Sequence, residues 1–231
     1  LAACILTAGA PAKADVQVEV NLSGLPSKDL EALAGESLLL LREEEPVDDR
    51  IAVERLAALD RAMLLKLLES RAYYGADISV TTTFSDNAAE LTFDVSPGNP
   101  YLLADISFDY GTNTDDRLPY DIEAFDLYAG MTAEAAPLKA LSGRLVQRLQ
   151  ELGYPEARIV RTRFVSDADL ETIDGELAID TGPLVTLGPI WFEGLQRVNE
   201  GYLRRLVSWQ SGGLYDPARL TRARRVLSAT G

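Results

Sequence analysis

Residues 135–155 read AAPLKALSGRLVQRLQELGYP, and they indicate how the rest of the chain is organised. Leucines recur here at spacings of three or four residues, which places them on one face of a helix. They are Leu138, Leu141, Leu145, Leu149 and Leu152. Gly153 and Pro155 then end the helix, and Tyr154 between them can fold back onto it. The stretch predicts one amphipathic helix with a defined end.

Strands are expected on both sides of this helix. Apolar residues alternate over residues 102–108 before it, and again over 157–165 and 177–179 after it. A polar turn at 166–169 joins the last two strands into a hairpin. A shorter helix is expected at 118–128, so the order is strand, two helices and two strands.

The same order occurs earlier in the chain. An alternating strand, Val16 to Leu22, is followed by a short helix at 28–34 and a longer one whose apolar face is formed by Leu56, Leu59, Met63 and Leu67. That helix ends at Ala72-Tyr73-Tyr74-Gly75, and a hairpin of residues 78–84 and 91–95 follows. The repetition at 80 to 84 residues predicts a repeat protein.

A third copy begins after residue 183. It has a strand at 187–192, a helix at 199–208 and a second helix with Leu220, Ala223 and Leu227. We therefore expect repeats at 15–99, 100–183 and 184–231, the third lacking its last hairpin. The expected class is α+β, with tandem β-α-α-β-β units that each form a three-stranded mixed sheet covered on one face by two helices.

Residues 1–14 have the composition of the end of a secretory signal. They are small and apolar, and Ala12-Lys13-Ala14 resembles a cleavage site. A second interpretation makes Cys4 the acylated residue of a lipoprotein box. Cleavage after Ala14 would leave a mature chain without cysteine.

The charge of the chain is strongly acidic but uneven. Its net charge is -14, which disfavours binding to nucleic-acid phosphates. Residues 185–231 nevertheless hold seven arginines and three acidic residues, a local balance of +4. This segment either faces different surroundings or carries an arginine-rich solvated helix.

The sequence shows no motif that is typical of catalysis or metal binding. There is no histidine, which excludes Ser-His-Asp catalysis and histidine-ligated zinc. Residues 212–215 lack the lysine of a phosphate-binding loop, residues 167–171 only begin like a calcium loop, and the acidic run at 43–49 is typical of a solvated cluster. We expect no catalytic residue, cofactor or metal site, and therefore no enzyme.

The third copy carries a recognisable string of residues. Phe192-Glu193-Gly194 is followed by Gly212-Gly213-Leu214-Tyr215-Asp216 and then by the apolar helix that ends at Gly231. This string resembles a polypeptide-transport-associated (POTRA) domain, although the opening F-x-G is degraded in the first two copies. Three such units, with Tyr-Tyr-Gly ending the first, are most similar to the TamA family of the BamA/TamA superfamily.

The resemblance implies a function in transport. The chain would be a periplasmic arm at the outer membrane, followed by a sixteen-stranded membrane barrel that this sequence does not contain. Its partners would be unfolded outer-membrane proteins or autotransporters and a TamB-like protein anchored in the inner membrane. The alternative is a structural or docking POTRA module of another envelope protein, without transport.

The resemblance also implies where clients bind. In this topology the strand after the helices lies at the sheet edge, where free backbone groups can pair with an extended segment. The edge residues expected are Ile78, Val80, Thr82, Arg158, Val160 and Thr162. Arginines on the second edge either attract acidic clients or guard against aggregation. A membrane-proximal basic face is expected from Arg204, Arg205, Arg222 and Arg225.

Overall fold

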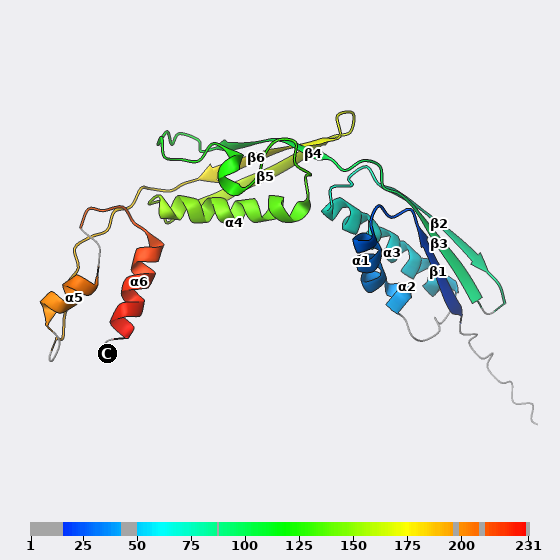
Figure 1. The fold of residues 1–231 in the computed structure, drawn as a ribbon, viewed down its shortest axis with the longest axis horizontal. Helices are drawn as coiled ribbons and strands as arrows, with labels where there is room; N and C mark the ends of the chain where they lie inside the picture. Colours follow the sequence, from blue (N-terminus) through cyan, green and yellow to red (C-terminus); the bar gives the residue numbers. More distant parts are fainter. Residues whose placement is uncertain (1–15, 43–49, 87, 196–198, 208–210, 230–231) are drawn as a thin grey trace, which may run out of the picture. The chain divides into compact units, whose positions relative to one another are not determined.

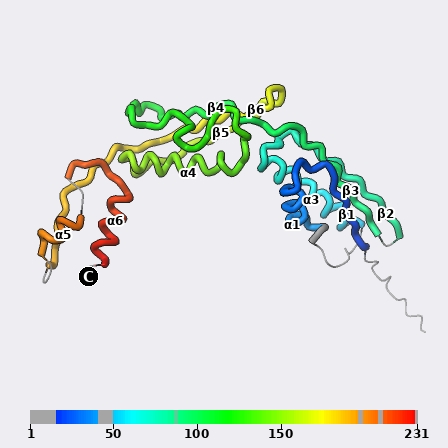
Figure 2. The backbone as a smooth tube through the Cα atoms, in the orientation of Figure 1, coloured from blue at the N-terminus to red at the C-terminus, as the bar shows by residue number. Residues whose placement is uncertain are grey.

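The computed structural model describes residues 16–42, 50–86, 88–195, 199–207 and 211–229. The signal-like segment 1–14 and the acidic run at 43–49 lie outside this part of the chain. The chain divides into two compact units, one ending at Tyr101 and one beginning at Leu102. Figures 1 and 2 show the course of the backbone in each.

The elements of unit 1 follow the expected order, with three helices in place of the expected two. They are β1 (Gln17–Ser23), α1 (Lys28–Ser37), α2 (Leu39–Arg42), α3 (Arg50–Ser70), β2 (Asp77–Phe84) and β3 (Ala88–Ser96). The sheet order is β1-β3-β2, in which β3 is parallel to β1 and antiparallel to β2. The helices lie on one face of this sheet (Figure 1). Alternate residues of the central strand, Leu91 and Phe93 among them, are fully buried beneath the helices.

The buried face of α3 differs from the expected one. Leu59 and Met63 are 50% and 38% exposed, and the buried stripe is instead Val53, Ala57, Asp60, Leu64 and Leu68. This stripe also has helical spacing, but a charged residue stands in its middle. Because Asp60 is charged, a search for apolar residues alone did not predict this stripe as the buried face.

Unit 2 repeats the arrangement with a thinner helical layer. Its elements up to residue 180 are β4 (Leu102–Asp109), η1 (Ile122–Phe125), α4 (Ala135–Glu151), β5 (Arg158–Asp167) and β6 (Thr172–Asp180). The sheet order is β4-β6-β5, again with one parallel and one antiparallel pair. The expected class, α+β with three-stranded mixed sheets and helices, is confirmed.

The helix expected at 118–128 is reduced to one 3₁₀ turn. η1 covers only four residues, and Asp126 ends it with a φ of 58°, in the left-handed region. Leu118, Ile122 and Phe125 are nevertheless buried. The apolar residues that predicted a helix thus pack as a loop with a single turn.

The strand expected at 187–192 is not formed. In the described residues of this segment only an isolated bridge occurs, between Thr186 and Leu214. The opening strands β1 and β4 each pair with the last strand of their own copy, and the residues that the structure describes after 183 include no such partner. Two helices do follow, α5 (Glu200–Leu206) and α6 (Pro217–Ser228). Because residues 102–231 cluster as one unit, the division into three repeats stays a prediction.

No helix among the described residues is both long enough and apolar enough to cross a membrane.

Candidate polypeptide-binding edges

The strands that follow the helices, β2 and β5, lie at sheet edges. The opposite edges are formed by β1 and β4, which the sequence reasoning did not consider. The outer side of β4 is partly occupied, because the Gly130 N–H donates to the Leu103 carbonyl at 2.7 Å and the Leu103 N–H donates to the Met131 carbonyl at 2.8 Å. The two predicted client-binding strands therefore have the position that edge pairing requires, while client binding itself stays a prediction.

The orientation of the β2 backbone follows from the hairpin turn. The Ser85 N–H donates to the Ala88 carbonyl at 2.8 Å, so the backbone of Ser85 points toward β3. Successive residues of a strand alternate in direction. The N–H and C=O groups of three predicted residues, Ile78, Val80 and Thr82, therefore point away from β3 and toward the open edge.

Arginines of α3 lie at both ends of this edge. Arg61 Nε donates to the Ile78 carbonyl at 2.7 Å, and its guanidinium pairs with Asp77 at 3.3 Å. Arg50 donates to the Ser85 carbonyl at 3.2 Å and lies over the Phe84 ring. The Ile78 carbonyl is thus occupied, and the open part of the β2 edge consists of Val80, Thr82 and, by the same alternation, Phe84.

Strand β5 contains a bulge at its beginning. Ile159 pairs with Ile179 and Arg161 with Ala178, so Val160 is an extra residue between them. Such a bulge bends an edge strand and interrupts regular pairing there. Val160, one of the predicted site residues, therefore lies at the irregular end of the edge, and the regular part begins after it.

The backbone groups of β5 that face the open edge can be identified from the pairing of β4 with β6. The Leu102 N–H donates to the Glu171 carbonyl at 2.9 Å, so this carbonyl points to β4 and the following N–H, that of Thr172, points to β5. Asp167, Val165 and Arg163 pair with Thr172, Asp174 and Glu176. By alternation, the backbone groups of the residue before Arg163 and of the two residues between the three paired positions face the open edge. These residues are Thr162, Phe164 and Ser166.

Strand β5 is exposed on both of its faces. Phe164 is 37% and Val165 is 45% exposed, although they point to opposite sides of the sheet. The turn between β5 and β6 projects beyond α4 (Figure 2), so this helix does not cover the far half of the strand. A polypeptide could therefore reach β5 without displacing a helix.

Two of the three β5 arginines are already paired. Arg158 forms an ion pair with Asp180, and Arg161 pairs with Glu176 at 2.6 Å. Arg163 is exposed and has no ion pair with any residue that the structure describes. Exposed ion pairs contribute little to stability. The pairs of Arg158 and Arg161 nevertheless keep their guanidinium groups close to the strand.

The predicted basic face is divided between two helices. Arg204 pairs with Glu200 at 2.7 Å and lies over the Phe192 ring, so its charge is engaged within this segment. Arg205, Arg222 and Arg225 are exposed. Arg222 and Arg225 are three residues apart on α6 and lie on the side away from its buried Ala223.

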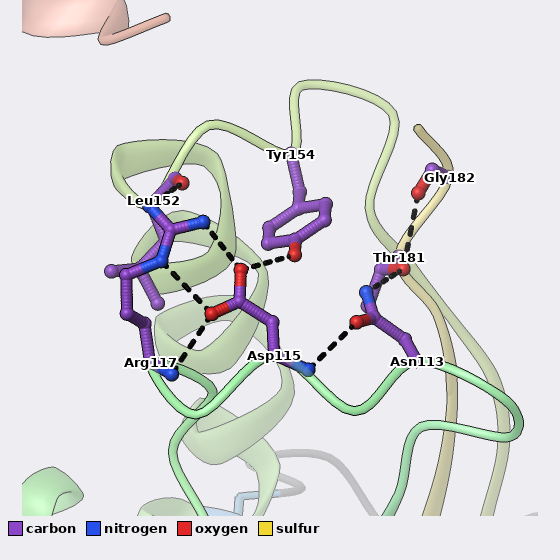
Figure 3. A network of polar contacts seen from close by, with 7 residues as sticks. All are labelled: Asn113, Asp115, Arg117, Leu152, Tyr154, Thr181 and Gly182. Carbon is purple, nitrogen blue, oxygen red and sulfur yellow. Dashed lines mark hydrogen bonds and ion pairs between the residues drawn. The ribbon is translucent and has the colours of Figure 1, made fainter. Parts of the chain in front are cut away.

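A polar network that the sequence did not reveal lies at the end of the unit 2 sheet (Figure 3). The Asp115 carboxylate accepts hydrogen bonds from the Tyr154 hydroxyl at 2.6 Å and from Arg117 Nε at 2.9 Å. The Arg117 side chain is the main cause that holds the pKa of Asp115 well below its usual range. Asn113 donates to the Thr181 hydroxyl at 2.8 Å.

This network has a structural function. It joins the loop after β4 to the end of α4 at Tyr154 and to the end of β6 at Thr181. Gly153, beside Tyr154, accepts a hydrogen bond from the Val185 N–H at 2.8 Å, where the chain continues toward α5. In the described part of the chain no cluster of acidic, cysteine or histidine side chains is arranged to hold a metal ion.

The fold and its edges define a class of protein: α+β units, each with a three-stranded mixed sheet and exposed edge strands. No family model matches the chain, and no curated protein matches it.

Solved structures similar to the chain include POTRA domains. The POTRA3-5 segment of BamA from Haemophilus influenzae is 18% identical, with a TM-score of 0.44, over 94% of this chain and 86% of that one. POTRA1-3 of Omp85 from Anabaena is 17% identical, with a TM-score of 0.44, over 93% and 84%. The N-terminal domain of Omp85 from Thermosynechococcus elongatus is 16% identical, with a TM-score of 0.40, over 94% and 86%.

Proposed function

We propose that the chain is a periplasmic polypeptide-binding arm of an outer-membrane assembly factor and that it binds unfolded clients along its sheet edges. The observation that carries the proposal is the presence of outward backbone groups on β2 and β5 where no other strand pairs. Hydrogen bonds to these groups depend on the client backbone and tolerate many side chains. This tolerance suits an arm that receives many outer-membrane proteins.

The finer assignment rests on the sequence resemblance. The chain would act in a TamA-like factor on the periplasmic side of the outer membrane, with outer-membrane proteins or autotransporters as clients. A TamB-like protein would deliver them, and a membrane barrel would follow the arm. The energy would come from folding and insertion of the client, since no nucleotide-binding motif is visible in the sequence.

The test of edge binding replaces one outward N–H. Thr162→Pro removes a donor that faces the open edge, whereas Thr162→Ala keeps it. Binding of an extended peptide from an outer-membrane β-strand should weaken roughly fivefold in the proline variant, the effect of one hydrogen bond. Fluorescence anisotropy measures it.

The control is the adjacent position. Arg163→Pro removes an N–H that faces β6, so it should lower the melting temperature more than Thr162→Pro does. Circular dichroism and melting must first establish that Thr162→Pro is folded. If the folded variant binds peptide as well as the parent, clients bind elsewhere and edge pairing is wrong.

A further inference from the structure

The two candidate edges differ in how open they are. On β2, Arg61 of α3 already occupies the outward carbonyl of Ile78. On β5, no described side chain donates to the carbonyls of Thr162, Phe164 or Ser166. A client strand would have to displace this arginine contact to pair along all of β2, but none to pair along this part of β5.

The open part of β5 also presents two chemically different sides. Thr162 and Ser166 pair with the buried residues Leu177 and Ile173, so these side chains and that of Phe164 lie on the helix side of the sheet. Arg161, Arg163 and Val165 lie on the opposite side. Neighbouring strands place side chains of one face next to each other. A bound segment would therefore contact Phe164 with one set of alternate residues and the arginines with the other.

The position of the Phe164 ring is fixed by the residue that it pairs with in β6. It pairs with Gly175, and a Cβ at residue 175 would come within 2.8 Å of the Phe164 ring and 2.9 Å of Ile106. The absent side chain lets the ring lie over the backbone of β6. The ring is thus held as an apolar surface beside the edge.

The charges on the other side disfavour pairing between two copies of this chain. If β5 paired antiparallel with β5 of a second molecule so that residue 163 of one copy lay opposite residue 161 or 163 of the other, arginines would meet arginines, and like charges in that position destabilise pairing. A segment with carboxylates at the same positions would instead meet Arg163, which has no ion pair with any described residue. The charge pattern favours an acidic client over a second copy.

We propose that β5, between Thr162 and Ser166, is the edge that receives clients, and that it selects extended segments in which apolar residues alternate with acidic ones. The apolar residues lie beside Phe164 and the carboxylates lie beside Arg161 and Arg163. This inference rests on the proposed function, because it names the kind of segment that the edge binds.

Two peptides test the selection. Both have the same alternating valine and phenylalanine residues, and the residues between them are glutamate in one and lysine in the other. The net charge of -14 would favour the lysine peptide if only the overall field mattered. Local recognition predicts the opposite order, with the glutamate peptide binding about two- to fivefold more tightly at 0.15 M salt.

Two variants assign the effect to side chains. Arg163→Glu should reverse the preference, and Phe164→Ala should weaken both peptides about equally. The binding edge is located by disulfide trapping in a Cys4→Ala background, which leaves the chain without cysteine. A peptide with one cysteine should be trapped by Ser166→Cys on β5 more efficiently than by Thr82→Cys on β2.

The outcomes separate this inference from the proposed function. Equal binding of both peptides, unchanged by Arg163→Glu, overturns the side-chain selection and leaves edge pairing standing. Trapping at Thr82→Cys that equals trapping at Ser166→Cys overturns the preference for β5. Disulfide-linked dimers of Ser166→Cys would make a second copy the occupant and overturn the proposal. If neither peptide binds, the proposed function itself is wrong.

Discussion

Asp60 shows at the scale of one residue how a polar group can belong to a core. Its side chain is fully buried in α3, and its carboxylate accepts the N–H groups of Leu39 at 2.7 Å and Leu40 at 2.9 Å. These N–H groups begin α2 and have no partner within that helix. Asp60 thus fastens α2 to α3 from the middle of an otherwise apolar stripe.

We expect Asp60→Ala to destabilise unit 1 by roughly 2–4 kcal/mol, because it leaves two N–H groups without an acceptor. Asp60→Asn should cost less, since one acceptor oxygen remains. Urea unfolding measured by circular dichroism checks both. A change below about 0.5 kcal/mol for the alanine variant would show that water or another group replaces the carboxylate.

Asp115 predicts a pH dependence in unit 2. Its pKa is lowered in the folded state, mainly by the Arg117 hydrogen bond, so the ionised form stabilises folding. The stabilisation is fully present above the ordinary carboxyl pKa of about 4 and is lost as the pH falls toward the lower folded value. The effect should be modest because the Arg117 side chain, which forms the main contact, is 38% exposed and solvent screens the pair.

The measurement compares the parent with Asp115→Asn between pH 7 and pH 2. The variant should be less stable at pH 7, and the difference in melting temperature should shrink as the pH falls below 4. Asp105→Asn, at an exposed position on β4, is the matched control. A difference that stays constant with pH would contradict a role for the Asp115 charge.

At the scale of elements, the two long helices differ in how well their pattern predicted their packing. The face of α4 is confirmed, because Leu138, Leu141, Leu145 and Leu149 are all buried. The face of α3 was wrong because Asp60 interrupts its apolar stripe. A helix with a single apolar stripe is predictable, whereas one with a buried polar contact is not.

Leu149→Ala should destabilise unit 2 by about 2–5 kcal/mol, as truncation of a buried leucine usually does. Leu59→Ala is the matched control on α3, where the side chain is 50% exposed, and should cost less than about 1 kcal/mol. Unfolding monitored by amide hydrogen exchange reports each unit separately. Loss of protection in unit 1 on Leu149→Ala would contradict independent folding of the two units.

At the scale of the whole molecule, the charge is distributed unevenly along the chain. The last segment carries a balance of +4 in a chain of net charge -14. Clusters of exposed arginines bind anionic headgroups, each contributing about 1 kcal/mol near the membrane surface. This favours the proposed basic face, to which Arg222 and Arg225 contribute an exposed pair on α6.

Reversing Arg222 and Arg225 to glutamate should weaken binding to vesicles with anionic lipid at least about tenfold. Reversing two exposed arginines of unit 1, Arg55 on α3 and Arg71 just after that helix, changes the net charge equally and is the control. Co-sedimentation with vesicles measures both, and melting confirms the fold. Equal losses in the two variants would favour a solvated helix over a specific basic face.

The sequence by itself determined the local order of this protein. The periodic leucines of α4, the glycine and proline after it and the alternation in each hairpin depend on neighbours within a few residues, so they were readable without a structure. The expected edge position of β2 and β5 came from the resemblance, and the topology agrees with it.

Only the tertiary structure decided which backbone groups are open to a partner. The bulge at Val160 depends on how β5 pairs with β6, Arg61 of α3 occupies the Ile78 carbonyl of β2, and Phe164 pairs with Gly175 of the neighbouring strand. A shift of one residue in the pairing of two strands moves every side chain of the shifted strand to the opposite face of the sheet. An alternating pattern therefore predicts a strand, but the direction in which its hydrogen-bonding groups point is set by the strands and helices packed beside it.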